Sequence, residues 1–230
     1  MGIKIDLYQH QNELLINSFD DIILKLMQKC SNSKIKSLLF CGSEPGVGTT
    51  TVTINMAVSL AQGNNKTILI DGDLRKSAKN KRLGQTPLFG LSDHFENRAT
   101  LTEIINHTNI KDLDYISCGK QSTQSTKTLR LNNFRSLISI LENDYDFILF
   151  DSPSLDVVND STVLSVLVDG IFLICELGKT TRSNISKMLK VFSESNDKIL
   201  GMLINKVDQP EYRMYIRNYD YFQKIRTKLI

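Results

Sequence analysis

Short apolar runs recur along the chain, and each has the length of a buried β-strand. These runs cover residues 35–41, 67–71, 113–117, 147–151, 170–176 and 199–205. Segments with the periodicity of an amphipathic helix lie between most of them, at 51–61, 131–142, 160–168 and 181–194. This alternation predicts an α/β fold, in which helices cover both faces of a mainly parallel sheet and form a three-layer α/β/α sandwich.

A further amphipathic helix is predicted near the N-terminus, over residues 11–29. Its apolar face carries Leu15, Phe19, Ile22 and Leu26. A polar break at 31–34 separates this helix from the first strand. We therefore predict an N-terminal helical segment (1–34), a central domain (35–208) and a tyrosine-rich, basic C-terminal tail (209–230).

The bulk composition is that of an ordinary globular domain. Of the 230 residues, 41% are hydrophobic and 23% are charged, and the net charge is +3. The positive surplus lies in the tail, where six Lys and Arg from Lys206 onward stand against three Asp and Glu. This small charge gives no indication of nucleic acid binding. The basic tail would suit an acidic partner or the inner surface of a membrane, or it is simply a solvated segment.

The cysteines and histidines form no recognisable disulfide or zinc pattern. The four cysteines include no Cys-x-x-Cys pair, and the three histidines are scattered. No apolar run approaches the ~20 residues needed to cross a bilayer, and the N-terminus lacks the pattern of a signal peptide. We therefore expect a reduced, cytoplasmic protein that reaches a membrane only through a partner.

A glycine-rich segment after the first strand has the pattern of a phosphate-binding loop. Its backbone N–H groups and the start of the next helix would point at one spot and favour an anion there. Gly46 and Gly48 let the backbone approach phosphate oxygens without a Cβ clash. The usual motif ends in Gly-Lys-Ser/Thr, but Thr49 occupies the lysine position here, and Thr50 supplies the metal-binding hydroxyl. The alternative is a Gly-Pro turn without a ligand. The candidate nucleotide-binding residues are Gly46, Val47, Gly48, Thr49, Thr50 and Thr51.

Three aspartates follow buried strands. Asp71 and Asp73 come at the end of the second strand, and Asp151 ends the fourth. The carboxyl ends of parallel strands line the ligand site of such sheets, and buried carboxylates there are unfavourable unless they bind a cation or a polarised water. We predict that Asp71 and Asp73 are catalytic and that Thr50, Asp71, Asp73 and Asp151 form a Mg²⁺ site. An aspartate that caps a helix in an ordinary turn is the alternative.

The last strand ends in a pattern known from guanine recognition, Asn-Lys-x-Asp at residues 205–208. In that pattern the Asp carboxylate accepts hydrogen bonds from N1 and N2 of guanine. Alternatively, Asn205 lies at the strand end and contacts whichever base is bound. Asn205 is therefore a further candidate nucleotide-binding residue.

Tyrosines gather in the tail. Four of the seven fall in the last nineteen residues, and Tyr212, Tyr215 and Tyr219 would share one face of a helix. A packed amphipathic helix explains this spacing without any chemistry. The tyrosines beside Arg and Asp also suit phosphorylation. The candidate phosphoacceptors are Tyr212, Tyr215, Tyr219 and Tyr221.

Taken together, these segments resemble the bacterial tyrosine kinases (BY-kinases) of capsular and exopolysaccharide biosynthesis. That family carries a phosphate-binding loop, an Ile-Leu-Ile-Asp-x-Asp-x-Arg segment, an Ile-Ile-Asp-x-Pro segment and a C-terminal tyrosine cluster. The matching segments here are 46–50, 68–75, 148–153 and 212–221. They follow the family's order, and the resemblance spans residues 13–221.

The resemblance implies a cytoplasmic domain that binds ATP and Mg²⁺ and phosphorylates tyrosines in the tail of a neighbouring copy. It also implies a membrane adaptor of the polysaccharide co-polymerase type at the inner face of the membrane, and a homo-oligomer that cycles between a ring and monomers. A tyrosine phosphatase or an active kinase paralogue would be further partners. Because the family ends the strand at Asn205 in the same way yet uses ATP, the resemblance favours ATP over GTP.

The chain departs from the family at several positions. Thr49 replaces the loop lysine. Ile16 and Phe19 stand where the family has the two arginines of Glu-x-x-Arg-x-x-Arg, a motif of the N-terminal helix that contacts the next subunit. Ser77 and Asn80 stand in place of a Pro and a His. We therefore predict that nucleotide binding is retained, that catalysis is impaired, and that no ring forms through the usual arginine contacts.

Three alternatives stay open from the sequence. One is an active autokinase whose missing cation is supplied by Arg75 or Lys76. A partition-type ATPase is disfavoured, since Glu44 stands where those proteins carry an additional lysine. The third is a GTPase. In the main interpretation the chain is a regulatory module on the adaptor, or a substrate that presents its tyrosines to an active paralogue.

Overall fold

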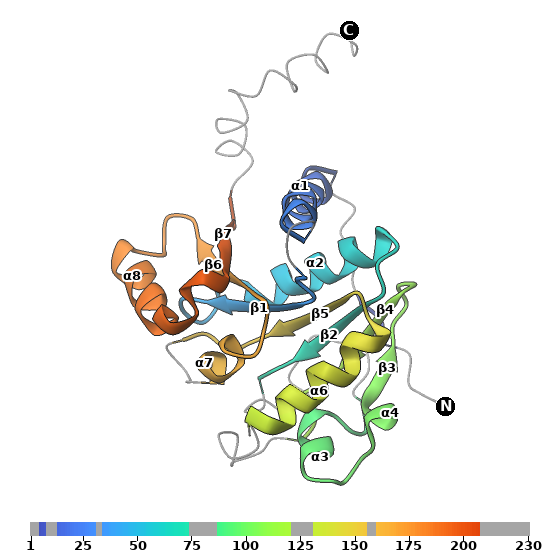
Figure 1. Ribbon diagram of the computed structural model, residues 1–230. Coiled ribbons are helices and arrows are strands. Elements are labelled where there is room, and N and C mark those ends of the chain that lie inside the picture. The colour runs from blue at the N-terminus through green and yellow to red at the C-terminus, as the bar shows by residue number, and fades with distance from the viewer. Residues whose placement is uncertain are drawn as a thin grey trace, which may run out of the picture.

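Within the part of the chain that the structure describes, seven strands form one sheet in the order β3-β4-β2-β5-β1-β6-β7 (Figure 1). The computed structural model describes residues 5–7, 13–30, 34–73, 87–120, 131–155 and 160–207. The strands are β1 (Ser37–Gly42), β2 (Thr67–Asp71), β3 (Ile105–His107), β4 (Leu113–Ile116), β5 (Phe147–Asp151), β6 (Gly170–Glu176) and β7 (Ile199–Asn205). All neighbouring strands pair in parallel except β3 and β4, so the predicted mainly parallel sheet is confirmed.

Helices cover both faces of this sheet. They are α1 (Glu13–Cys30), α2 (Thr49–Gln62), α3 (Leu91–Phe95), α4 (Leu101–Ile104), α6 (Leu131–Asp144), α7 (Asp160–Ser165) and α8 (Arg182–Val191), with a 3-10 helix, η2 (Ser193–Lys198). In Figure 1, α1 and α2 lie on one side of the strands, and α6 and α7 lie on the other. This is the predicted three-layer α/β/α sandwich.

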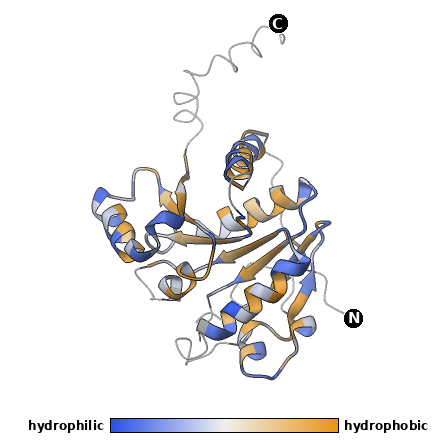
Figure 2. Cartoon of the chain, viewed as in Figure 1, coloured by the Kyte–Doolittle hydropathy of each residue, from blue (hydrophilic) through white to orange (hydrophobic). Residues whose placement is uncertain are grey.

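The strands are apolar on both faces because both faces are covered. One buried cluster joins β5 to α6, where the rings of Phe134 and Phe150 meet edge to face with centroids 6.1 Å apart. The other lies under α1 and α2, where the rings of Phe40 and Phe172 stack at 5.3 Å. Figure 2 shows the central strands as largely hydrophobic. Continuous apolar runs, rather than alternating ones, are typical of such doubly covered strands.

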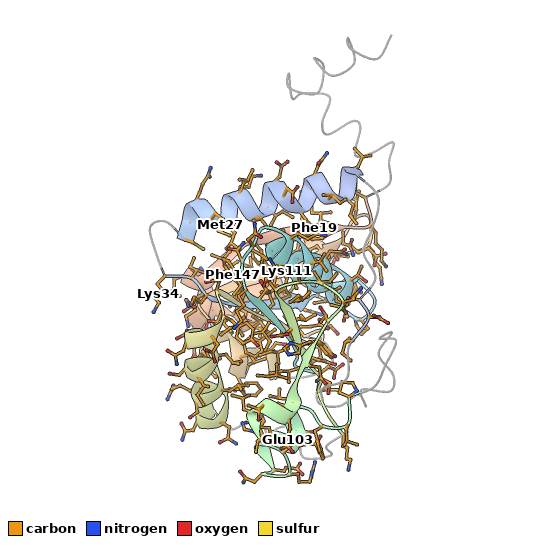
Figure 3. The ribbon with its side chains drawn as sticks, turned by 90° about the vertical axis from the view of Figure 1, so that its right-hand side faces the viewer. Phe19, Met27, Lys34, Glu103, Lys111 and Phe147 are labelled. Carbon is orange, nitrogen blue, oxygen red and sulfur yellow. The ribbon has the colours of Figure 1, made fainter. Side chains whose placement is uncertain are left out.

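Helix α1 packs onto the same core through the face that the sequence predicts. Phe19 and Leu26 are buried, and Leu15 and Ile22 pack against them. Figure 3 shows Phe19 and Met27 on the side of α1 that faces the rest of the molecule. Phe19 therefore contributes to the chain's own core, whereas Ile16, the other residue in place of a family arginine, is 38% exposed. The proposed boundary at residue 34 stays a prediction.

Several short elements were not expected from the sequence. The three residues of β3 pair antiparallel at the sheet edge, and Ile5 adds a bridge to Thr108 beyond them. Helices α3 and α4 have only five and four residues, too few for a periodic pattern to emerge. The helix expected over 181–194 ends at Val191 and continues as η2. None of the helices in the described ranges is long and apolar enough to cross a membrane.

Candidate functional site

The glycine-rich loop connects β1 to α2 at the carboxyl edge of the sheet. It leaves β1 at Gly42 and enters α2 at Thr49. Gly46 and Gly48 have φ angles of 85° and 94°, in the left-handed region where glycine is preferred. The start of the loop is tied to the sheet, because the N–H of Ser43 donates to the Ile174 carbonyl at 3.3 Å. The backbone thus has the left-handed turns that a phosphate-binding loop requires.

The predicted acidic residues meet beside this loop. Asp71 and Asp151 are register partners at the ends of β2 and β5. The Thr50 hydroxyl donates to Asp151 Oδ2 at 2.7 Å, and the N–H of Asp73 donates to Asp71 Oδ1 at 3.0 Å. Asp71, Asp73 and Asp151 are all buried, with 2%, 5% and 5% of their surface exposed. The strand order therefore brings together side chains that are up to 101 residues apart in the sequence.

The oxygen donors of this group fit Mg²⁺ chemically. Carboxylates and a threonine hydroxyl are hard ligands, which suit Mg²⁺ rather than a softer metal. The described residues contain no group of three or more His, Cys, Asp or Glu side chains placed to hold a metal by themselves. Mg²⁺ usually takes one or two carboxylates together with water and substrate phosphates, so it does not need such a group. The assignments of Thr50, Asp71, Asp73 and Asp151 as metal ligands, and of Asp71 and Asp73 as catalytic, stay predictions.

Thr49 places no charge in the loop. The residue is 9% exposed, and a Cβ at Gly42 would collide with its hydroxyl, so this side chain is turned back toward β1. Its carbonyl accepts a hydrogen bond from the Thr53 hydroxyl at 2.9 Å within α2. Arg75 and Lys76, the sequence-based candidates for a relocated cation, lie outside the described residues.

The carboxyl end of β7 contacts the loop from a second direction. Asn205 Nδ2 donates to the Val47 carbonyl at 2.8 Å, and Lys206 Nζ donates to the Gly46 carbonyl at 2.7 Å. Lys206 also pairs with Glu176 at 3.0 Å, and its hydrogen bond lowers the pKa of that carboxyl group. The sequence singled out Asn205 as a base contact. Lys206 was missed as a loop contact, although it belongs to the Asn-Lys-x-Asp pattern, and so was its ion-pair partner Glu176.

A cysteine precedes the loop but is no candidate nucleophile. Cys41 is fully buried in β1, and this burial raises the pKa of its thiol to about 11. A thiol of that pKa is almost entirely protonated at neutral pH and therefore unreactive.

Two of the predicted nucleotide-binding residues differ in solvent exposure. Val47 is buried in the loop, whereas Thr51 is exposed on α2.

The predicted phosphoacceptors lie outside the described residues, and their role stays a prediction. They are Tyr212, Tyr215, Tyr219 and Tyr221. The same holds for Asp208, which would distinguish guanine from adenine in the Asn-Lys-x-Asp pattern, and for Ser77 and Asn80.

Comparison with known proteins identifies relatives over most of the chain. Residues 36–205 match the family described as AAA domain. Tyrosine-protein kinase CpsD of Streptococcus agalactiae is 31% identical over 180 residues, which cover 78% of this chain and 79% of CpsD. CpsD of Streptococcus pneumoniae serotype 4 is 31% identical over 182 residues, with 77% and 79% covered. The crystal structure of the chimerical protein CapA2B2 matches with a TM-score of 0.77 at 25% identity, and the match covers 83% of this chain and 84% of that one.

The loop between β1 and α2, with aspartates at the ends of the neighbouring strands, defines a P-loop NTPase fold. Within that class, the chain belongs to the bacterial tyrosine kinases (BY-kinases) of capsular and exopolysaccharide biosynthesis, the family that its sequence resembles. The relatives include proteins named for their tyrosine kinase activity. In this chain Thr49 occupies the lysine position of the loop, so its own kinase activity does not follow from the names of its relatives.

Proposed function

We propose that this chain is a nucleotide-binding, tyrosine-kinase-like domain that regulates the polymerisation and export of a capsular polysaccharide or exopolysaccharide, and that its own phosphoryl transfer is impaired. The observation that carries this proposal is the short, buried Thr49 in the lysine position of a loop that is otherwise formed. Family membership supports the polysaccharide context. The left-handed glycines and the neighbouring carboxylates support retained binding of ATP and Mg²⁺.

The proposed ligands follow from the contacts around the loop. The loop backbone and the N-terminus of α2 would hold the phosphates, and Asn205 would lie near the base. Thr50 and Asp151, already hydrogen-bonded at 2.7 Å, would hold Mg²⁺ with help from Asp71. When bound, the metal would neutralise charge on the phosphate oxygens. Asp73 and Asp71 would orient the attacking tyrosine hydroxyl and accept its proton.

The absence of the loop lysine is expected to lower the rate of phosphoryl transfer more than the affinity for ATP. A hydrogen bond to a charged group contributes about 1.5–3 kcal/mol, so affinity for ATP would fall about ten- to a hundredfold. The lysine also neutralises charge that develops on the moving phosphoryl group, and removal of one such preorganised donor typically lowers a rate about a hundred- to a thousandfold. Weak nucleotide binding thus survives where efficient kinase turnover does not.

The proposed partners follow from the family. A membrane adaptor of the polysaccharide co-polymerase type would recruit the domain from the cytoplasm to the inner face of the membrane. The tail tyrosines would be phosphorylated by an active kinase paralogue and dephosphorylated by a tyrosine phosphatase. A homo-oligomer, if formed, would use contacts other than the arginines that Ile16 and Phe19 replace. Burial of Phe19 in the chain's own core supports this last point.

The proposed Mg²⁺ site is tested by replacing two of its proposed ligands, Thr50 and Asp151, one at a time. We expect Thr50→Val and Asp151→Asn each to lower the affinity for ATP–Mg²⁺ about tenfold in calorimetric titrations, because each removes a hard oxygen ligand. Their affinity for ATP in EDTA should stay close to that of the wild type. Asp197→Asn is the control, since it removes an exposed carboxylate on η2. Wild-type affinity that is the same with and without Mg²⁺ would contradict the proposed site.

A further inference from the structure

Two consecutive residues at the end of β7 bond two consecutive peptide carbonyls of the loop. Asn205 bonds the Val47 carbonyl, and Lys206 bonds the Gly46 carbonyl, at 2.8 and 2.7 Å. The donors come from a chain position about 160 residues away. The pair is therefore a tertiary connection between the sheet edge and the loop, independent of the loop's own turns.

These two bonds fix the direction of the loop's N–H groups. All peptide bonds of the described chain are trans, so the C=O of one residue and the N–H of the next point in opposite directions. With the Gly46 and Val47 carbonyls held toward β7, the N–H groups of Val47 and Gly48 point to the opposite side of the loop. Within the described part of the chain, neither N–H makes a hydrogen bond. Successive N–H groups that face one side form an anion-binding nest.

The contacts around Lys206 hold its side chain in this position. Lys206 has a φ of 58°, a left-handed conformation that is uncommon for a residue other than glycine. Its ammonium group lies between the Gly46 carbonyl and the Glu176 carboxylate, which Lys179 also approaches at 3.5 Å. Because it bonds a carbonyl, Lys206 lies on the outer side of the loop, away from the nest. It does not take the place of a lysine at the phosphates.

We propose that Lys206 and Asn205 are positioning residues that hold the loop in its anion-binding conformation in a chain whose loop has no lysine. Holding a loop in its bound conformation raises affinity, because less ordering remains to be done on binding. The effect should act on the phosphates and be independent of the base. This inference rests on the proposed nucleotide binding, and it adds Lys206 and Glu176 to the residues on which that binding depends.

The test compares a ligand that has a base with one that has none. We expect Lys206→Met to lower the affinity for ATP–Mg²⁺ and for inorganic tripolyphosphate–Mg²⁺ by the same factor, about tenfold. Lys206→Arg should restore most of the loss. Lys179→Met is the matched control, because it also removes a cation beside Glu176 but one that makes no hydrogen bond to the loop. A loss confined to ATP would show a direct contact with the base and would overturn the inference, as would unchanged affinity for both ligands.

A second measurement needs no ligand. Hydrogen exchange of the loop amides at Glu44 and at residues 46–48 should be at least several times faster in the ligand-free Lys206→Met protein than in the wild type, while exchange in β1 stays unchanged. If the wild type bound neither ligand but the variant showed this faster exchange, the proposed nucleotide binding would be wrong and the positioning role would hold. Equal exchange in the two proteins would overturn the positioning role.

Discussion

Replacement of Thr49 with lysine is expected to raise the rate of tyrosine phosphorylation about a hundred- to a thousandfold. Among the described residues the loop has its left-handed turns and the strand ends bring Asp71 and Asp151 together, but position 49 carries no cation. A lysine at this position would bring a cation to a loop whose backbone N–H groups already favour anions. The measurement is the initial rate of phosphotyrosine formation with ATP and Mg²⁺, by mass spectrometry of the full-length chain.

Thr49→Met is the control for this gain, because methionine is nearly as long as lysine and carries no charge. A gain in both variants would show that side-chain length, and so the shape of the loop, limits the wild type. A gain in neither variant, with ATP binding intact, would contradict the claim that the missing lysine limits transfer. The candidate cations Arg75 and Lys76, and the missing arginines of the N-terminal helix, would then be tested by substitution.

Gly48→Ala is expected to weaken ATP–Mg²⁺ binding about thirty- to a hundredfold and to lower the free energy of unfolding by about 2–3 kcal/mol. A left-handed conformation disfavours a residue with a Cβ by about 1–2 kcal/mol. The added Cβ would also collide with Asn205 Nδ2, which breaks the hydrogen bond to Val47 and removes about 1 kcal/mol more. The two effects together amount to about 2–3 kcal/mol. Because the loop must regain its conformation before a nucleotide binds, this corresponds to about a thirty- to hundredfold loss of affinity.

A second glycine distinguishes the effect of backbone strain from the effect of the collision with Asn205. Gly178 has a φ of 74°, and a Cβ there would meet nothing within 4 Å. Gly178→Ala should therefore lower stability by about 1–2 kcal/mol and leave nucleotide affinity nearly unchanged. Thermal unfolding and calorimetric titration of both variants give the comparison. Equal affinity losses in the two variants would show that the contact between Gly48 and Asn205 has no part in binding.

Much of the fold could be predicted because its strands are buried on both faces. A strand with apolar residues on both faces, such as β5 or β6, is visible as a continuous run, and its boundaries agree closely with the sequence prediction. The acidic site was predictable for a related reason. Asp71 and Asp151 each end such a run, and parallel strands bring their carboxyl ends to one edge.

The features that escaped prediction depend on contacts between distant parts of the chain. Strand β3 has only three residues and pairs at an edge, where tertiary context outweighs propensity. The contact from Lys206 to Gly46 depends on how β7 lies against the loop, and the sequence pattern pointed to the base instead. Likewise, the burial of Phe19 follows from the packing of α1, whereas the family comparison placed this residue at a subunit contact.

The central claim is that this chain binds ATP–Mg²⁺ but transfers its phosphate poorly. The most direct test is a calorimetric titration of the purified chain with ATP–Mg²⁺, followed by detection of phosphotyrosine in the same sample. We predict measurable binding and no phosphotyrosine at Tyr212, Tyr215, Tyr219 or Tyr221. Phosphotyrosine that disappears in Asp73→Ala would contradict the claim, because it would show a working kinase without the loop lysine. If the chain did not bind ATP–Mg²⁺ at all, the claim would also be contradicted, and a scaffold role that needs no nucleotide would remain.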